Sequence, residues 1–382
     1  MIVSTLEELR LYSPANAIDN IDTIQGFLDS SEQDFLSEKL GQKLYDSLTA
    51  YYRQLRDNGK VETFVSSIVN GDALTPYARL LNLCQRCVTF DALGRAVDMQ
   101  AISVNGAGVN VATATDYAKA DNDAVRNYKA TCVKEAHAAV NRILVVLEDW
   151  TKDIAQLSDK SSTDENINSS TDENINSSTD ETSSDDTLTE EKEIVALWRK
   201  SRYFFLAASL IIPSASVLQE YLNIYDSREK FIQMLPDLRY LQEDVLAPAI
   251  GDDLTEYIVT MSQQLGETIS EDSKTLTESQ QRLLLRIIHK ARKAMARLLE
   301  SRTMQFRTTD QRRETARTEG NRLVQDLGEF ITVHYKELPD AALDAFKKSP
   351  LYATVDDDET NDYTPQFQNN QEGNAMFITP AI

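Results

Sequence analysis

The chain has 382 residues and a formal net charge of −22, from 61 acidic and 39 basic side chains. This excess of acid argues against tight binding of a nucleic-acid backbone or an anionic membrane by the whole chain, because both kinds of binding depend on Lys and Arg. Three cysteines cannot form a disulfide framework, which favours a reducing, cytoplasmic location. The N-terminus lacks a signal-peptide pattern, and the most apolar run, 204–212, is shorter than the about 20 residues of a membrane span.

The first domain is predicted over residues 1–157 as a helical bundle, because apolar side chains recur at spacings of three and four. The stripes are Leu6, Leu9 and Tyr12; Ile18, Ile21, Ile24 and Leu28; Phe35, Leu36, Leu40, Leu44 and Leu48; Leu80, Leu81, Cys84, Cys87, Val88 and Ala92; and Val133, Ala136, Val140, Leu144 and Leu147. The last stripe belongs to a long helix that is predicted over residues 125–147.

Between the last two helices, residues 101–112 predict an inserted β-hairpin. Apolar and small polar residues alternate on both sides of Asn105-Gly106, and Asn-Gly is a strong signal for a tight turn. A hairpin on a helical body is a candidate arm for contact with a partner, and its candidate contact residues are Ile102, Val104, Asn105, Gly106 and Val109. A plain connection between two helices is the alternative.

Residues 158–193 predict a disordered acidic linker. The octapeptide Ser-Ser-Thr-Asp-Glu-Asn-Ile-Asn occupies 161–168 and again 169–176, and a third copy begins at 177. The segment carries a charge of −10 and has few apolar residues, so it cannot bury enough surface to offset the entropy lost on ordering.

The second domain is predicted over 194–349, again helical, as a probable duplication of the first. At an offset of 210 residues, Leu36-x-x-x-Leu40-Gly41-x-x-Leu44 aligns with Leu246-x-x-x-Ile250-Gly251-x-x-Leu254. The alternative is that two amphipathic helices align by periodicity alone. A flexible polar tail follows over 350–382, with a charge of −6 and a short apolar end that includes Phe377 and Ile378 as candidate partner contacts.

Catalytic and metal-binding motifs have little support in the sequence. Cys84-x-x-Cys87 lies in an amphipathic helix, where two cysteines on one face are typical of a core, and its combination with Cys132 and His137 fits no zinc pattern. The three histidines lie far apart in the sequence, and no nucleophile motif is present. We therefore expect no catalytic residues, no cofactor and no metal site, and no enzymatic activity.

One basic segment opposes the overall charge. Twelve basic and four acidic residues lie between Arg282 and Arg322, several of them at helical spacing. Arg292, Lys293 and Arg297 are the candidate contacts of a surface that binds an acidic partner or nucleic acid. The alternative is a solvated helix face that neighbouring acidic residues balance.

The opening Thr5-Leu6-Glu7-Glu8-Leu9, together with Phe35-Leu36-Ser37-Glu38-Lys39-Leu40-Gly41-Gln42-Lys43-Leu44, resembles the head–tail connector (neck adaptor) proteins of tailed phages. The two-part layout also resembles a family of phage and prophage proteins of gut bacteria, through Trp198-x-x-Ser201 and Asp226-Ser227-Arg228-Glu229-x-Phe231. The resemblance implies small helical bundles with a hairpin before the last long helix. The long linker and the absence of a second hairpin depart from it.

The leading hypothesis is therefore a structural virion protein at the phage neck. The resemblance implies that it assembles in the host cytoplasm and binds portal or tail-completion proteins and copies of itself in a ring. An acidic chain also suits a conduit through which DNA passes without specific binding. No membrane contact is expected. The alternative hypothesis is a non-virion interaction protein of a mobile element, which would use its basic 282–322 surface; a hydrolase or metal enzyme comes third.

Overall fold

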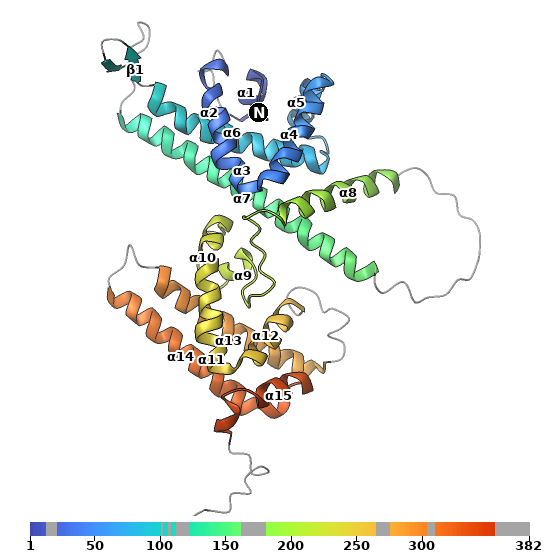
Figure 1. The fold of residues 1–382 in the computed structure, drawn as a ribbon, viewed down its shortest axis with the longest axis vertical. Helices are drawn as coiled ribbons and strands as arrows, with labels where there is room; N and C mark the ends of the chain where they lie inside the picture. The colour runs from blue at the N-terminus through green and yellow to red at the C-terminus, as the bar shows by residue number, and fades with distance from the viewer. Residues whose placement is uncertain are drawn as a thin grey trace, which may run out of the picture. The chain divides into compact units, whose positions relative to one another are not determined.

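The protein is described by a computed structural model over residues 1–12, 21–100, 102–105, 108–111, 122–161, 181–264, 276–303 and 310–355. Over these ranges the fold is mainly α-helical, as predicted, and none of the described helices is long and apolar enough to cross a membrane. The chain divides into two compact units (Figure 1). Unit 1 comprises Met1–Leu206 and Ser227–Ile232, and unit 2 comprises Ala207–Asp226 and Gln233–Ile382.

Unit 1 is a bundle of helices with two short strands. Its elements are α1 (Leu6–Tyr12), the 3-10 turn η1 (Ile21–Thr23), α2 (Gln25–Ser30), the π-helical η2 (Ser31–Leu36), α3 (Ser37–Leu40), α4 (Gln42–Asp57), α5 (Val61–Asn70), α6 (Pro76–Gln100), β1 (Ile102–Asn105), β2 (Gly108–Val111), α7 (Asn122–Ser161) and α8 (Glu181–Trp198). Helix α6 begins at Pro76, whose fixed φ suits the first position of a helix.

The core of unit 1 forms around the long helices α6 and α7, which pack against each other. The prediction that Cys84 and Cys87 are core residues is confirmed, because both thiols are fully buried and burial raises the pKa of each. The apolar stripe of α3 and α4, with Leu40, Leu44 and Leu48, is also fully buried. Periodicity therefore identified the buried faces of these helices correctly.

The strands β1 and β2 lie between α6 and α7 in the sequence. They pair antiparallel, with Ile102 opposite Val111 and Val104 opposite Val109. Gly106 and residue 107 lie outside the described residues.

Helix α8 corrects the predicted extent of the disordered linker. The prediction covered 158–193, but α7 continues to Ser161 and α8 begins at Glu181. The apolar residues that follow the acidic stretch explain the helix, because Ile194, Val195 and Trp198 are buried in unit 1. A helix whose last turns are anchored in a core can extend outward through a polar sequence. The remaining linker residues, 162–180, lie outside the described ranges.

Unit 2 is also helical. Its elements are α9 (Ala215–Gln219), α10 (Arg228–Leu241, of which 228–232 belong to unit 1), the π-helical η4 (Gln242–Leu246), α11 (Ala247–Ile250), α12 (Asp252–Gln264), α13 (Glu278–Thr303), α14 (Asp310–His334), the 3-10 turn η7 (Tyr335–Glu337), α15 (Asp340–Lys347) and the 3-10 turn η8 (Tyr352–Thr354). Helices α13 and α14 form the central pair. Gly320 makes their close approach possible, since a Cβ there would lie 2.6 Å from Leu298 Cδ2.

The boundary between the units differs from the predicted start of a second domain at 194. Residues 194–206 belong to unit 1, as does the short segment Ser227–Ile232. Phe205 and Phe231 show the reason, because both are fully buried and their rings meet edge to face with centroids 6.3 Å apart. The spacing of apolar residues along the sequence does not reveal a contact between such distant segments, so the boundary could not be predicted from it.

Candidate interaction surfaces

Each unit contains a tight joint between two helices at a glycine. In unit 1, Gly41 has φ +80° and ψ 146° between α3 and α4, and a Cβ there would lie 2.7 Å from Ser201 Cβ. The Ser201 N–H donates to the Trp198 carbonyl at 2.7 Å, which closes a turn after α8. The Trp198 ring meets Phe204 edge to face, with an interplanar angle of 76°.

The same arrangement occurs in unit 2. Gly251 has φ +97° and ψ 143° between α11 and α12, and a Cβ there would lie 2.7 Å from Ser349 Cβ. The Ser349 N–H donates to the Phe346 carbonyl at 2.9 Å, and Phe346 meets Tyr352 edge to face at 86°. In both units, positive φ and lack of space exclude a side chain at the glycine.

In each unit a polar side chain from the π-helical segment binds the backbone of a non-helical segment, near Ile2 in unit 1 and near Ile211 in unit 2. Glu32 accepts from the Ile2 N–H at 2.7 Å and from the Tyr45 hydroxyl at 2.9 Å. In unit 2, Gln242 accepts from the Ile211 N–H at 2.9 Å and donates its own N–H to the Ser209 carbonyl at 2.8 Å. Glu32 is buried, and burial is the main cause that raises the pKa of its carboxyl.

Arg292 of α13, a predicted contact residue, binds the carbonyl of the same residue, Ile211. Its Nε–H donates to the Ile211 carbonyl at 2.9 Å, and its terminal N–H donates to the Ser262 carbonyl at 3.3 Å. In unit 1 the amide of Gln85, on α6, donates to the Ile2 carbonyl at 2.6 Å. Arg292 therefore holds unit 2 together, and its guanidinium is not a free surface cation.

The other basic residues of the 282–322 segment mostly face acidic partners. Arg297 binds Glu319 at 2.9 Å and also pairs with Glu300, whereas Lys293 is exposed. Further pairs in or beside this segment are Arg282–Glu278, Arg302–Asp237, Arg313–Asp310, Arg317–Glu314 and Arg322–Asp326. This pairing favours a balanced helix face over a surface for nucleic acid.

A polar cluster in unit 1 has no counterpart in the sequence analysis. Glu229, in the first turn of α10, accepts from His137 Nδ1 of α7 at 2.8 Å and lies 3.3 Å from Lys39 Nζ. Lys39 also donates to the Tyr203 hydroxyl at 2.8 Å. The hydrogen bond to Glu229 raises the pKa of His137. Burial alone would raise the pKa of Glu229, but the interactions with His137 and Lys39 outweigh burial, and the pKa of Glu229 is lowered.

A second ion pair holds the same segment. Arg228 Nε donates to Glu148 of α7 at 3.1 Å, and both side chains are buried; the Arg228 N–H donates to Asn141 at 3.0 Å. Sequence reasoning missed these contacts because the partners lie about 80 positions apart. The only signal was the motif Ser227-Arg228-Glu229-x-Phe231, whose polar residues precede an apolar anchor.

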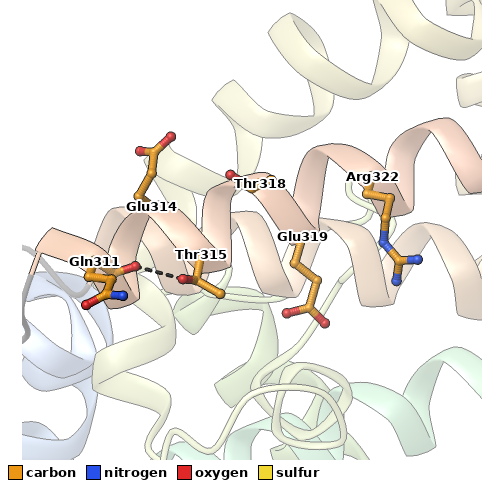
Figure 2. Close-up of a pocket in the computed structure, with 6 residues that line it drawn as sticks. All are labelled: Gln311, Glu314, Thr315, Thr318, Glu319 and Arg322. Atoms are coloured by element: carbon orange, nitrogen blue, oxygen red, sulfur yellow. Dashed lines mark hydrogen bonds between the residues drawn. The ribbon is translucent and has the colours of Figure 1, made fainter.

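Two surface hollows of the described residues bear on binding. One lies along α14 in unit 2 and is lined by Gln311, Glu314, Thr315, Thr318, Glu319 and Arg322 (Figure 2). All six come from one helix, and the Thr315 hydroxyl donates to the Gln311 carbonyl of the same helix, so this hollow is an open helix face. The other lies between α6 and α7 in unit 1. Among the described residues there is no group of three or more potential metal ligands.

Two groups of predicted contact residues are not placed in detail. Of the hairpin set, Ile102, Val104, Asn105 and Val109 lie in β1 and β2, and Gly106 lies outside the described ranges, as do Phe377 and Ile378. The predictions for their contacts therefore stay predictions.

Comparison with known proteins gives one match. No curated protein and no solved structure matches the chain significantly. Residues 36–167, which run from the end of η2 through α7, match the model of a family of unknown function, DUF6712.

Proposed function

We propose that the chain is a structural adaptor built from two copies of one helical unit, of the head–tail connector kind that joins portal to tail in tailed phages. The observation that carries the proposal is the likeness of the two glycine joints, which supports an internal duplication. The joints at Gly41 and Gly251 use the same backbone conformation and the same serine contact. Two unrelated helical bundles have no reason to share such a detail, whereas amphipathic periodicity alone accounts only for similar helices.

Further pairs of contacts support the duplication. Tyr12 of unit 1 donates to Asn82 at 2.8 Å, and Tyr221 of unit 2 lies 3.0 Å from His289 Nδ1. Each tyrosine follows the residue whose carbonyl is bound, Ile2 or Ile211. Its partner lies three positions before the side chain that binds that carbonyl, Gln85 or Arg292.

Differences between the units follow local chemistry. In unit 1 the carboxylate of Glu32 faces donors: the Ile2 N–H, the Tyr45 hydroxyl and the Met1 amino group at 3.4 Å. In unit 2 the Ser209 carbonyl faces this position, and a carboxylate there would meet a second acceptor. The amide of Gln242 supplies both an acceptor and a donor. With Gln in place of Glu, the buried side chain at this position therefore keeps its hydrogen-bond partners.

The resemblance to connectors supports the assignment to the phage neck. The residues that carry it, 35–44, form the end of η2, all of α3 and the start of α4, and the strands β1 and β2 fall between the two long helices, where connectors carry a hairpin. The proposed partners are portal or tail-completion proteins and further copies of the chain in a ring. DNA would pass through this ring without specific contacts.

The test is native mass spectrometry of the purified chain with a portal protein of a tailed phage. We expect a ring of several copies or a stable complex with the portal protein. A chain that stays monomeric and binds neither portal nor tail proteins would contradict the proposal. A variant with residues 102–111 replaced by a Gly/Ser stretch of equal length should lose the complex but keep the helical circular dichroism signal. Replacement of residues 162–180 in the same way is the matched control, and it should retain binding.

A further inference from the structure

The hollow between α6 and α7 has an apolar floor and a basic rim. Leu83 of α6 and Val145 and Val146 of α7 provide apolar surface, and Arg79 and Arg142 contribute guanidinium groups from the two helices. The volume is about 400 Å³, which is within the usual range of about 300–1,000 Å³ for ligand sites. All of its lining residues belong to unit 1.

Arg142 differs from Arg86 and Arg95 of this helix pair. Arg86 binds Glu135 at 3.2 Å, and Arg95 binds Asp91 at 2.7 Å. Arg142 is exposed, and its guanidinium forms no ion pair or hydrogen bond within the described part of the chain. A guanidinium held beside an apolar surface without a carboxylate is available to a partner that brings one.

Arg79 is held in place on the opposite rim. Its guanidinium lies 5.9 Å from the centre of the Trp150 ring. The pKa of Glu191 of α8 is raised, mainly by burial and also by the charge of Asp153, and the positive charge of Arg79 opposes this shift. Asn82 is fixed as well, since its oxygen accepts from the Tyr12 hydroxyl. The basic rim is therefore pre-organised on this side, which lowers the entropic cost of binding.

We propose that this groove docks an acidic peptide segment of a partner protein, with an aliphatic side chain on the floor and flanking carboxylates on Arg79 and Arg142. Charge complementarity carries the choice of occupant, because carboxylates match guanidinium groups in charge and geometry. A nucleic-acid backbone fits less well, because it presents a continuous run of phosphates, whereas the groove offers two guanidinium groups beside an apolar surface. The inference rests on the proposed role in assembly and names the chemistry of one partner.

The experiment measures fluorescence anisotropy of a labelled peptide, Glu-Asp-Ile-Asp-Glu, with the full chain. We expect saturable binding that weakens at least tenfold between 50 and 300 mM NaCl, and that weakens similarly when Gly replaces the peptide's Ile. Arg142→Glu should weaken binding at least tenfold. Lys134→Glu, an exposed change of the same charge on the same helix, should change it less than twofold.

Other results would overturn the proposal. Equal binding by the Arg142→Glu and Lys134→Glu variants would show that the groove is not the site. Competition by a 12-base-pair DNA duplex at the peptide's concentration would indicate a nucleic-acid surface instead. If replacement of residues 162–180 by a Gly/Ser stretch raised peptide affinity tenfold, the occupant would be the chain's own acidic repeat. Peptide binding and portal binding are separate readouts, so failure of the groove leaves the ring measurement intact.

Discussion

At the scale of single residues, the two glycine joints are the most demanding positions in the fold. Gly41 combines φ +80° with a site where a Cβ would press against Ser201 Cβ, and Gly251 repeats both features against Ser349. The sequence alignment identified the pair of glycines, but it could not identify the serines, which lie 160 and 98 positions further along the chain. Only the folded structure explains why both glycines are required.

Gly41→Ala is expected to destabilise unit 1 by about 2 kcal/mol or more, because it adds backbone strain of about 1–3 kcal/mol and a steric clash. Thermal denaturation followed by circular dichroism measures the effect. Gly26→Ala is the control: it lies in α2 with no atom within 4 Å of the new Cβ, and should stabilise by about 0.5–1 kcal/mol. Unchanged stability of Gly41→Ala would contradict the account of the joint.

Gln242→Glu tests the buried amide. At pH 7 the new carboxylate would face the Ser209 carbonyl without a donor, which should cost about 1–3 kcal/mol. A protonated carboxyl could donate to that carbonyl, so the loss relative to the wild type should shrink as pH falls toward the ordinary glutamate pKa of about 4.3. Urea denaturation at pH 7.5 and 4.5 gives the comparison, and the exposed Gln325→Glu should show no such change. A loss that is independent of pH would argue against this contact.

At the scale of elements, sequence periodicity predicted the helices and their buried faces, as Leu40, Leu44, Cys84 and Cys87 show. It did not predict contacts between distant elements, which depend on three-dimensional packing. Arg292 looked like a surface cation because it shares a helix with many arginines, yet it binds two carbonyls in unit 2. The start of α8 was also not predicted, because the polar local composition does not show that Trp198, at the end of this helix, is buried in the core of unit 1.

The first turn of α10 gives a prediction about pH, because Glu229 pairs with His137 of α7. The pKa of His137 is raised, so its contribution to stability is present below its ordinary value of 6.5 and is lost as pH rises through the raised pKa. The pKa of Glu229 is lowered, so its contribution is present above 4.5 and is lost as pH falls through the lowered pKa. The pair therefore stabilises unit 1 most between about pH 4.5 and 6.5.

An NMR titration of the histidine rings measures this directly. His137 should titrate above 6.5 in the wild type, and its pKa should fall in Glu229→Gln. His334→Gln is the control, which should remove one of the three histidine signals and leave the His137 titration unchanged. A His137 pKa that does not respond to Glu229→Gln would contradict the ion pair.

At the scale of the whole molecule, the charge has a definite distribution. The linker 158–193 and the tail 350–382 carry −16 of the total −22, and residues 194–349 are neutral overall. Ion pairs such as Arg297–Glu319 balance much of the basic segment within unit 2. Association of the folded parts is therefore less opposed by electrostatic repulsion than the net charge implies.

The most direct test of the proposed role at the phage neck is cryo-electron microscopy of tailed-phage particles assembled in the presence of this chain. We predict a ring at the neck in which every chain contributes two similar helical units, each with a glycine joint against a serine turn. Particles with no copies of the chain at the neck, or chains whose two units have different folds, would contradict the account.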